Sequence, residues 1–255
     1  MKKTPSLCIA GIVFLFWTGF VLSGDPIKIF LAGDSTMAEK LPEKWPETGW
    51  GEALQAFFDT TKVVVENHAR NGRSTRTFLE EGRWQTLIGR VNKGDYVFIQ
   101  FGHNDESKQK ADRYTPPEQY RANLRRFVQD VRSKEATPVL LTPIVRRRFD
   151  SSGTFYDVHG VYPDVVRDVA KELNVPLIDM HRMSEDTLKS YGPERSEALF
   201  LLLKPGEYAN YPNGLTDDTH FSPAGAAIMA GMAVKGIRDL HLGLEQFLVP
   251  QAVHR

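Results

Sequence analysis

Short apolar runs alternate with amphipathic segments along most of the chain. The apolar runs predict five buried strands, bounded by turn-forming residues. These strands span residues 27–32, 63–66, 96–101, 138–142 and 176–179. Between the strands, apolar side chains recur at helical spacing, as at Tyr120, Leu124 and Phe127. The clearest helical segments span residues 48–58, 117–133, 161–173 and 224–240.

This alternation predicts an α/β fold. Apolar strands separated by helices are typical of a parallel sheet covered on both faces. Right-handed crossovers then give a three-layer α/β/α sandwich around a five-stranded parallel sheet. Ligands of such folds bind beyond the carboxyl ends of the strands. A functional site is therefore expected in the segments that follow the strands, at residues 33–36, 67–74, 102–105 and from 143 onward.

The first 24 residues have the pattern of a secretory signal peptide. Lys2 and Lys3 precede an apolar run, and Ser23 or Gly24 suits the end of the cleaved segment. A retained anchor is the alternative, because the run nearly reaches the ~20 residues that a membrane span needs. Cleavage would leave a single domain over residues 25–255, secreted or periplasmic, with no membrane attachment.

Composition narrows the chemistry. Cys8 is the only cysteine, so the cleaved chain would have no disulfide, cysteine nucleophile or thiolate metal site. The 32 basic and 32 acidic residues balance, and nothing points to nucleic acid as a partner. Arg146, Arg147 and Arg148 form the one dense basic run. This run is either a solvated loop or a contact for an acidic substrate.

Ser35 is the candidate nucleophile, because it follows the first strand and its hydroxyl would face the expected crevice. A serine hydroxyl needs a base within hydrogen-bond reach, and by itself Ser35 also fits a simple turn or helix cap. His220 is the best-placed base, since Asp217 lies three residues earlier in a loop-like segment. In a loop or single turn Asp217 could hold the imidazole in the required tautomer.

Acyl transfer also needs donors for the developing oxyanion. Gly72 follows the second predicted strand, and glycine lets a backbone amide approach a ligand closely. Asn104 follows the third and offers a side-chain amide. Either residue alone would fit a turn. The predicted sheet brings both together with Ser35 and the Asp217 and His220 pair, and this joint occurrence favours a serine hydrolase.

These blocks resemble the SGNH (GDSL) hydrolase superfamily over nearly the whole cleaved chain. The matching blocks are Gly33-Asp34-Ser35, Gly72, Gly102-His103-Asn104-Asp105 and Asp217-Asp218-Thr219-His220. Longer stretches, Gly33 to Ala38, Gly49-Trp50-Gly51, Asn71 to Phe78 and Phe101 to Asp105, are similar to the rhamnogalacturonan acetylesterases of carbohydrate esterase family twelve. The resemblance implies a flavodoxin-like SGNH fold and a secreted esterase that removes acetyl groups from pectin, with no metal or cofactor. It also implies that the amides of Ser35 and Gly72 and the side chain of Asn104 form the oxyanion hole.

Substrate contacts are a weaker prediction. Tyr208 and Tyr211 precede the His220 segment, and Arg146 and Arg148 follow the fourth strand, so all four are candidates to bind an acidic pectin oligosaccharide. Other acylated substrates remain alternatives: xylan, sialic acid, a lipid or a thioester. So do a non-catalytic carbohydrate-binding protein and a metal-dependent hydrolase. The last would use Asp34, Asp105, Asp217 and His220. The oligomeric state is left open.

Overall fold

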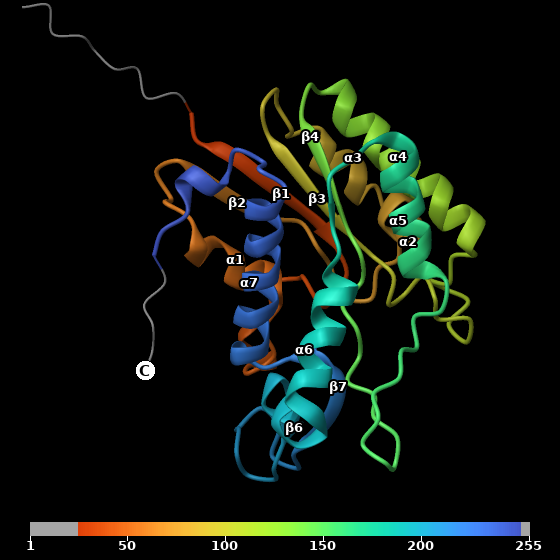
Figure 1. Ribbon diagram of the computed structural model, residues 1–255, viewed down its shortest axis with the longest axis vertical. Helices are drawn as coiled ribbons and strands as arrows, with labels where there is room; N and C mark the ends of the chain where they lie inside the picture. The colour runs from red at the N-terminus through yellow and green to blue at the C-terminus, as the bar shows by residue number, and fades with distance from the viewer. Residues whose placement is uncertain (1–24, 251–255) are drawn as a thin grey trace, which may run out of the picture.

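The structure, a computed structural model, describes residues 25–250, and its centre is a five-stranded parallel sheet (Figure 1). The strands lie in the order β2-β1-β3-β4-β5. Their bounds are β1 Ile27–Gly33, β2 Val63–Asn67, β3 Tyr96–Gln100, β4 Thr137–Leu141 and β5 Leu177–Ile178. The predicted α/β fold with five parallel strands is confirmed. The predicted signal peptide lies outside the described residues.

Helices cover both faces of the sheet, so the molecule has three layers (Figure 1). One face carries α1 Trp50–Leu54, α6 Met180–Arg195 and α7 Pro223–Asp239. The other carries α2 Thr75–Glu80, α3 Arg83–Ile88, α4 Pro117–Ser133 and α5 Tyr162–Leu173. Single 3-10 turns, η1 Pro42–Lys44, η2 Gln55–Phe57, η3 Ser196–Leu199 and η4 Glu245–Phe247, lie in the connections. None of the helices in residues 25–250 is both long and apolar enough to cross a membrane.

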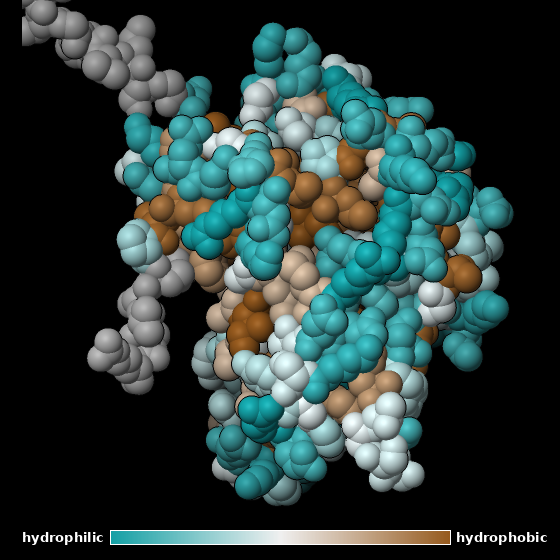
Figure 2. Space-filling view, viewed as in Figure 1, coloured by the Kyte–Doolittle hydropathy of each residue, from teal (hydrophilic) through white to brown (hydrophobic). Residues whose placement is uncertain are grey.

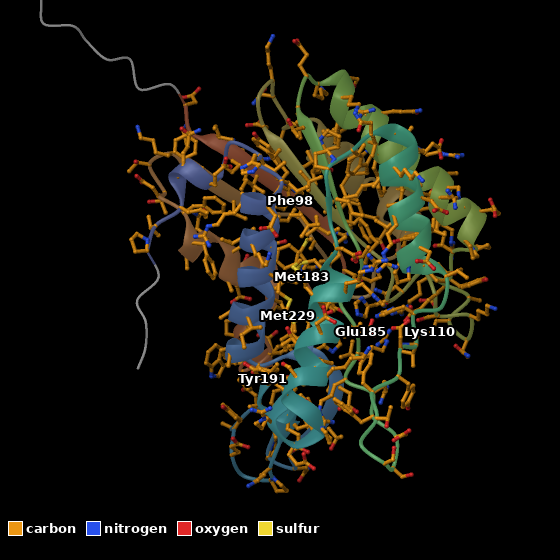
Figure 3. The ribbon with its side chains drawn as sticks, in the orientation of Figure 1. Phe98, Lys110, Met183, Glu185, Tyr191 and Met229 are labelled. Atoms are coloured by element: carbon orange, nitrogen blue, oxygen red, sulfur yellow. The ribbon has the colours of Figure 1, made fainter. Side chains whose placement is uncertain are left out.

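The alternation of side chains along β1 builds two separate cores. Leu31 packs into the core under α1 and α7, whereas Phe30 packs into the core under α3 and α4. Phe98 and Met229, labelled in Figure 3, belong to the first of these layers, between the sheet and α7. In Figure 2 hydrophilic residues cover most of the visible face, and apolar residues show mainly across its upper middle. Packing on both faces of the sheet holds the carboxyl ends of the strands in fixed positions.

The sequence did not predict α2, α3 and α6. The first two are short, at six residues each, and give little helical periodicity. The third contains Gly192 and Pro193, and Gly192 has a φ of 72° inside the helical segment. Glycine and proline interrupt the pattern that would otherwise indicate one long helix.

A small antiparallel hairpin lies outside the parallel sheet, and it overturns one prediction. It pairs β6 Phe200–Leu203 with β7 Leu215–Phe221, at the lower end of Figure 1. The predicted loop that carries Asp217 and His220 is therefore strand β7. Its residues are mostly polar and half-buried, so they lack the apolar alternation by which a sequence predicts a strand.

Candidate active site

Ser35 lies on a tight turn directly after β1. The turn is built by Asp34, whose backbone oxygen accepts hydrogen bonds from the amides of Met37 and Ala38 at 3.3 and 3.0 Å. The Asp34 carboxylate also accepts from the amide of Thr36 at 3.0 Å and from its hydroxyl at 2.8 Å. An aspartate that bonds its own backbone two residues on is a common way to fix a turn. Ser35 is held at the tip of this turn, at the end of a central strand.

β7 brings a histidine and an aspartate to this serine. His220 Nε2 lies 2.8 Å from Ser35 Oγ, and His220 Nδ1 lies 2.7 Å from Asp217 Oδ2. Strand pairing skips between Leu201↔Asp217 and Phe200↔Phe221, so the residues between Asp217 and Phe221 bulge out of the ladder. In a regular strand, side chains three positions apart point to opposite faces. The bulge lets those of Asp217 and His220 meet on one face. The predicted contact is therefore present, although within a strand instead of a loop.

Asp217 is held in its ionised form. Burial alone would raise the pKa of this carboxyl group. The hydrogen bond and charge of His220, with the amides of His220 and Thr219, outweigh burial and lower the pKa to about 2. A carboxylate at Nδ1 favours the tautomer that carries its proton there. Nε2 of a neutral imidazole is then free to accept the Ser35 proton.

The predicted oxyanion donors, at Ser35, Gly72 and Asn104, line one cleft. Within residues 25–250, neither the amide of Ser35 nor that of Gly72 donates to another protein group. Asn104 Nδ2 donates one hydrogen to the backbone oxygen of Arg73 at 3.0 Å, which leaves its second hydrogen unused. Gly72 has a φ of 77°, and a Cβ there would lie 3.1 Å from Arg113 Nη1. Both the backbone angle and the space therefore favour glycine.

These groups open onto a cleft of about 430 Å³. Ser35, Gly72, Asn104 and His220 all line it. Its other lining residues are Lys44, Glu47, Asn71, Arg73, His103, Ser107, Lys110, Arg113, Arg146 and Thr219. A larger cavity lies at the opposite end of the sheet, beside Lys28 and Asp95, and holds none of these groups. The chemistry is therefore assigned to the smaller cleft at the carboxyl ends of the strands.

Comparison with known proteins places this chain in a family. Residues 31–228 match the GDSL-like Lipase/Acylhydrolase family. The chain belongs to this family. The resemblance to SGNH hydrolases is thereby confirmed, and the chain is a carboxylic ester hydrolase.

Two curated relatives from Bacillus subtilis (strain 168) align with almost the whole described chain. The rhamnogalacturonan acetylesterase RhgT is 42% identical over 224 residues, covering 88% of this chain and 95% of the relative. The probable rhamnogalacturonan acetylesterase YesY is 34% identical, covering 88% and 98%.

Solved structures agree on the fold. The crystal structure of protein YxiM from Bacillus subtilis aligns with a TM-score of 0.73 at 26% identity, covering 86% of this chain and 58% of that one. This chain thus spans less than two thirds of that protein. An acetylxylan esterase from Geobacillus stearothermophilus aligns with a TM-score of 0.62 at 23% identity, covering 84% of this chain and 95% of that one.

In this acylhydrolase, the residues predicted to bind substrate lie in different places. Arg146 lines the cleft, but its guanidinium donates to Thr219 Oγ1 at 2.7 Å and to Glu106 Oε1 at 3.0 Å. Arg148 is not a lining residue and instead pairs with Asp218 at 3.1 Å. Both arginines thus already have protein partners: Thr219 and Asp218 lie next to His220 in the chain, and Glu106 follows β3.

The two tyrosines do not line the cleft either. Tyr208 and Tyr211 form an isolated bridge in the connection between β6 and β7. The Tyr211 hydroxyl donates to the backbone oxygen of Lys44 at 3.1 Å, so it supports the cleft wall from outside. Tyr208 and Tyr211 are therefore not among the residues that line this cleft, and their part in substrate binding stays a prediction.

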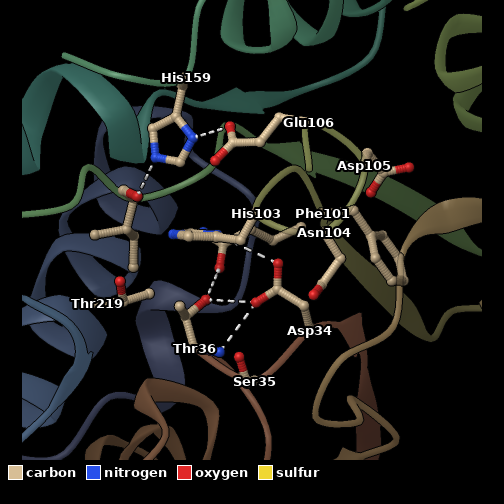
Figure 4. A network of polar contacts seen from close by, with 12 residues as sticks. Asp34, Ser35, Thr36, Phe101, His103, Asn104, Asp105, Glu106, His159 and Thr219 are labelled. Carbon is tan, nitrogen blue, oxygen red and sulfur yellow. Dashed lines mark hydrogen bonds and ion pairs between the residues drawn. The ribbon is translucent and has the colours of Figure 1, made fainter. Parts of the chain in front are cut away.

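The sequence missed a buried histidine pair beside the cleft. His159 is 1% exposed, and its two ring nitrogens lie 2.5 Å from Glu106 Oε2 and 2.9 Å from the backbone oxygen of Ile144. Both ring nitrogens of His159 therefore face oxygen atoms of the protein. His103 packs edge-on against it and lies 3.3 Å from Asp34 (Figure 4). His159 sits in a loop without periodicity, so nothing in the sequence distinguishes it from a surface histidine.

The acidic cluster that a metal-dependent hydrolase would need is not assembled. Asp105 is buried and accepts hydrogen bonds from the amide and hydroxyl of Thr75 at 3.0 and 2.6 Å. Asp34 is held by Thr36 and His103. Across residues 25–250, no three His, Asp, Glu or Cys side chains are grouped as metal ligands. The four residues of that alternative therefore do not form one site.

Proposed function

We propose that this chain is a secreted serine acetylesterase that removes acetyl groups from acidic pectic polysaccharide such as rhamnogalacturonan. The observation that carries the proposal is the hydrogen-bonded series from Asp217 through His220 to Ser35, at 2.7 and 2.8 Å, beside unused amide donors. The names of RhgT and YesY support the choice of acetyl group and of polymer.

In the first step, Ser35 Oγ attacks the acetyl carbonyl carbon while His220 Nε2 takes the hydroxyl proton. The charge that develops on the carbonyl oxygen is stabilised by the amides of Ser35 and Gly72 and by the side chain of Asn104. Asp217 keeps the imidazole oriented and stabilises its protonated form. No metal or cofactor takes part in this scheme.

Collapse of the tetrahedral intermediate breaks the ester bond. His220 gives its proton to the departing sugar oxygen, and the acetyl group stays on Ser35 as an ester. Water then enters, loses a proton to His220 and attacks the acetyl carbon. Acetate leaves, and Ser35 regains its proton from His220.

The charge of the cleft supports an acidic substrate. Five of its lining residues are basic, namely Lys44, Arg73, Lys110, Arg113 and Arg146, and one is acidic, Glu47. Lys44 and Lys110 form no ion pair with any residue in 25–250, so their charges face solvent and ligand. Such a field attracts an anionic polymer. A lipid substrate would need an apolar channel, and this lining is polar.

Replacement of Ser35 by alanine tests the reaction. The variant should lose acetyl ester hydrolysis by about 10⁴-fold or more, because it lacks the nucleophile. It should also fail to react with a fluorophosphonate probe that labels the unaltered protein. Wild-type rates in the variant would remove Ser35 from the mechanism, and a lack of labelling in both proteins would favour a non-catalytic carbohydrate-binding role.

Acetate release tests the substrate. Acetylated rhamnogalacturonan oligosaccharides should be cleaved with a higher kcat/KM than acetylated xylan, acetylated sialic acid or lipid esters. Added salt should reduce this preference, since it screens the basic cleft. Equal kcat/KM for pectic and neutral substrates would contradict the acidic substrate while leaving the esterase mechanism intact.

Secretion is proposed from residues 1–24, with their basic start, apolar run and small residues. Expression in a bacterial host and sequencing of the mature amino terminus test it. A start at about residue 25, in the periplasm or medium, is expected, whereas an intact terminus in the membrane fraction would indicate an anchor.

A further inference from the structure

A buried ammonium group, that of Lys40, contacts the turn that carries Ser35, called here the nucleophile turn. The Lys40 side chain is 3% exposed and does not line the cleft. Its Nζ donates to the backbone oxygen of Ser35 at 2.5 Å, to Asn71 Oδ1 at 3.1 Å and to Glu47 Oε1 at 2.7 Å. An ammonium has three hydrogens, so each of its donors has one acceptor.

The three acceptors come from three parts of the candidate site. Ser35 is the nucleophile itself, and Asn71 directly precedes Gly72. Glu47 precedes Thr48, whose amide donates to the backbone oxygen of Phe221 at 3.0 Å, next to His220. Lys40 thus joins the nucleophile turn, the oxyanion loop and the segment that carries the base.

Lysine suits this place for physical reasons. Its compact ammonium donates in three directions, whereas the planar guanidinium of arginine donates in one plane. Burial of a lone charge would be costly, and Glu47, at 11% exposed, supplies the opposite charge within 2.7 Å. Removal of Lys40 alone would leave the Glu47 carboxylate without this partner.

We propose that Lys40 is a positioning residue, which fixes the distance between Ser35 and the amide of Gly72. This inference rests on the proposed function. Holding Asn71 by its side chain limits rotation of the peptide that carries the Gly72 amide. Misplacement of such a donor by about 1 Å can reduce the rate by roughly 10²-fold. Lys40 does not touch the cleft, so it acts on kcat and not on substrate binding.

The first test replaces Lys40 by methionine, alone and together with Glu47→Gln, so that no carboxylate is left unpaired. Glu47 lines the cleft, so Glu47→Gln alone is the reference. With a small acetyl ester, kcat of the double variant should fall about 10- to 100-fold below that of Glu47→Gln, while KM stays within about threefold. Lys189→Met is the matched control, because that lysine is exposed and pairs with Glu185 on α6, and it should keep wild-type kinetics.

The second test restores the ammonium chemically. Lys40→Cys is alkylated in the unfolded state with bromoethylamine, which rebuilds a side chain of lysine length, or with iodoacetamide, which adds a neutral amide. After refolding, the first product should regain most of the lost kcat per active site and the second should not. The unaltered chain, treated in the same way, controls for the unfolding step and for alkylation at any other residue.

The outcomes separate the possibilities. Equal kcat in the double variant and in Glu47→Gln would overturn the proposal, and so would equal kcat in the two alkylated proteins. Failure of the double variant to fold would assign Lys40 to stability and would also overturn it. Loss of acetyl ester hydrolysis by the unaltered chain, or its survival in Ser35→Ala, would instead contradict the proposed function.

Discussion

The candidate site has two halves that are built in different ways. The sheet half, Ser35, Gly72 and Asn104, follows β1, β2 and β3 at adjacent strand ends. The hairpin half, Asp217 and His220, belongs to β7, which pairs with β6 and, at Phe221, forms an isolated bridge with Thr48. The first half inherits its geometry from a sheet buried on both faces. The hairpin half depends on contacts between the hairpin and the rest of the protein, because a two-stranded hairpin is marginally stable by itself.

Arginine side chains and single backbone amides provide some of these contacts. Arg146 donates to Thr219 Oγ1 at 2.7 Å, directly beside His220. Arg147 pairs with Asp218 Oδ1 at 2.9 Å, and its amide donates to the Asp218 backbone oxygen at 2.8 Å. The amide of Thr48 donates to the backbone oxygen of Phe221. Phe200 and Phe221 anchor the hairpin in the core, and these polar contacts hold the bulged residues between Asp217 and Phe221.

The largest expected effect tests the hairpin half. Asp217→Asn should reduce kcat by about 10³- to 10⁴-fold, because an amide no longer favours the tautomer with Nε2 free. Asp218→Asn is the matched control: it makes the same change one residue along, at a side chain that pairs with arginines and not with His220. Initial rates of acetyl ester hydrolysis measure both.

For the control, a loss below about tenfold is expected. Similar losses in both variants would mean that the effect comes from loosening of the hairpin, and Asp217 would have no special part in orienting His220. That result would favour polar fastening over tautomer control as the main role of this half.

Sequence patterns predicted the sheet half well. Apolar runs locate the parallel strands, and the topology of such sheets brings Ser35, Gly72 and Asn104 to one edge. The hairpin half was only partly predictable. The spacing of Asp217 and His220 indicated their contact, but a polar strand with a bulge leaves no apolar period. Arg148 was a candidate substrate contact because it follows the fourth strand in a basic run, and nothing in the sequence indicates its ion pair with Asp218.

The same limit explains Lys40 and His159. Both are polar residues that become buried because the fold gathers partners around them, Ser35, Glu47 and Asn71 at Lys40 and Glu106 at His159. A sequence predicts a polar residue to be exposed, and long-range pairing overrides that expectation. Burial of a charge with its partners is a tertiary property, and only the fold reveals it.

A smaller effect is expected in the sheet half from Gly72→Ala. The added Cβ meets Arg113 Nη1 at 3.1 Å, and the φ of 77° becomes strained, so the amide should shift and kcat should fall about 10²-fold. Gly82→Ala is the control, since its φ of 69° brings similar strain but its Cβ meets nothing within 4 Å. Equal activity in the two variants would exclude the Gly72 amide from oxyanion stabilisation. The Tm of each variant shows whether the two substitutions destabilise the fold to a similar extent.

The smallest expected effect is on stability, and it has opposite signs in the two halves. In the sheet half, burial raises the pKa of Asp105 to about 7 despite its hydrogen bonds from Thr75. The folded state then binds a proton more tightly than the unfolded chain, whose pKa is near 3.8, so stability falls as pH rises from about 4 to 7. Asp105→Asn should remove this fall.

In the hairpin half the sign reverses. Burial opposes ionisation of Asp217, but His220 and nearby amides lower its pKa to about 2, below the 3.8 of the unfolded chain. Its stabilisation is complete above pH 4 and is lost as pH falls through 2. The free energy of unfolding can be measured with urea from pH 2 to 8. The values for wild type and Asp217→Asn should converge at low pH. The values for wild type and Asp105→Asn should diverge as pH rises toward 7, with the variant the more stable. Parallel curves for Asp105→Asn would mean that this carboxyl group stays ionised in the core, held by Thr75 alone.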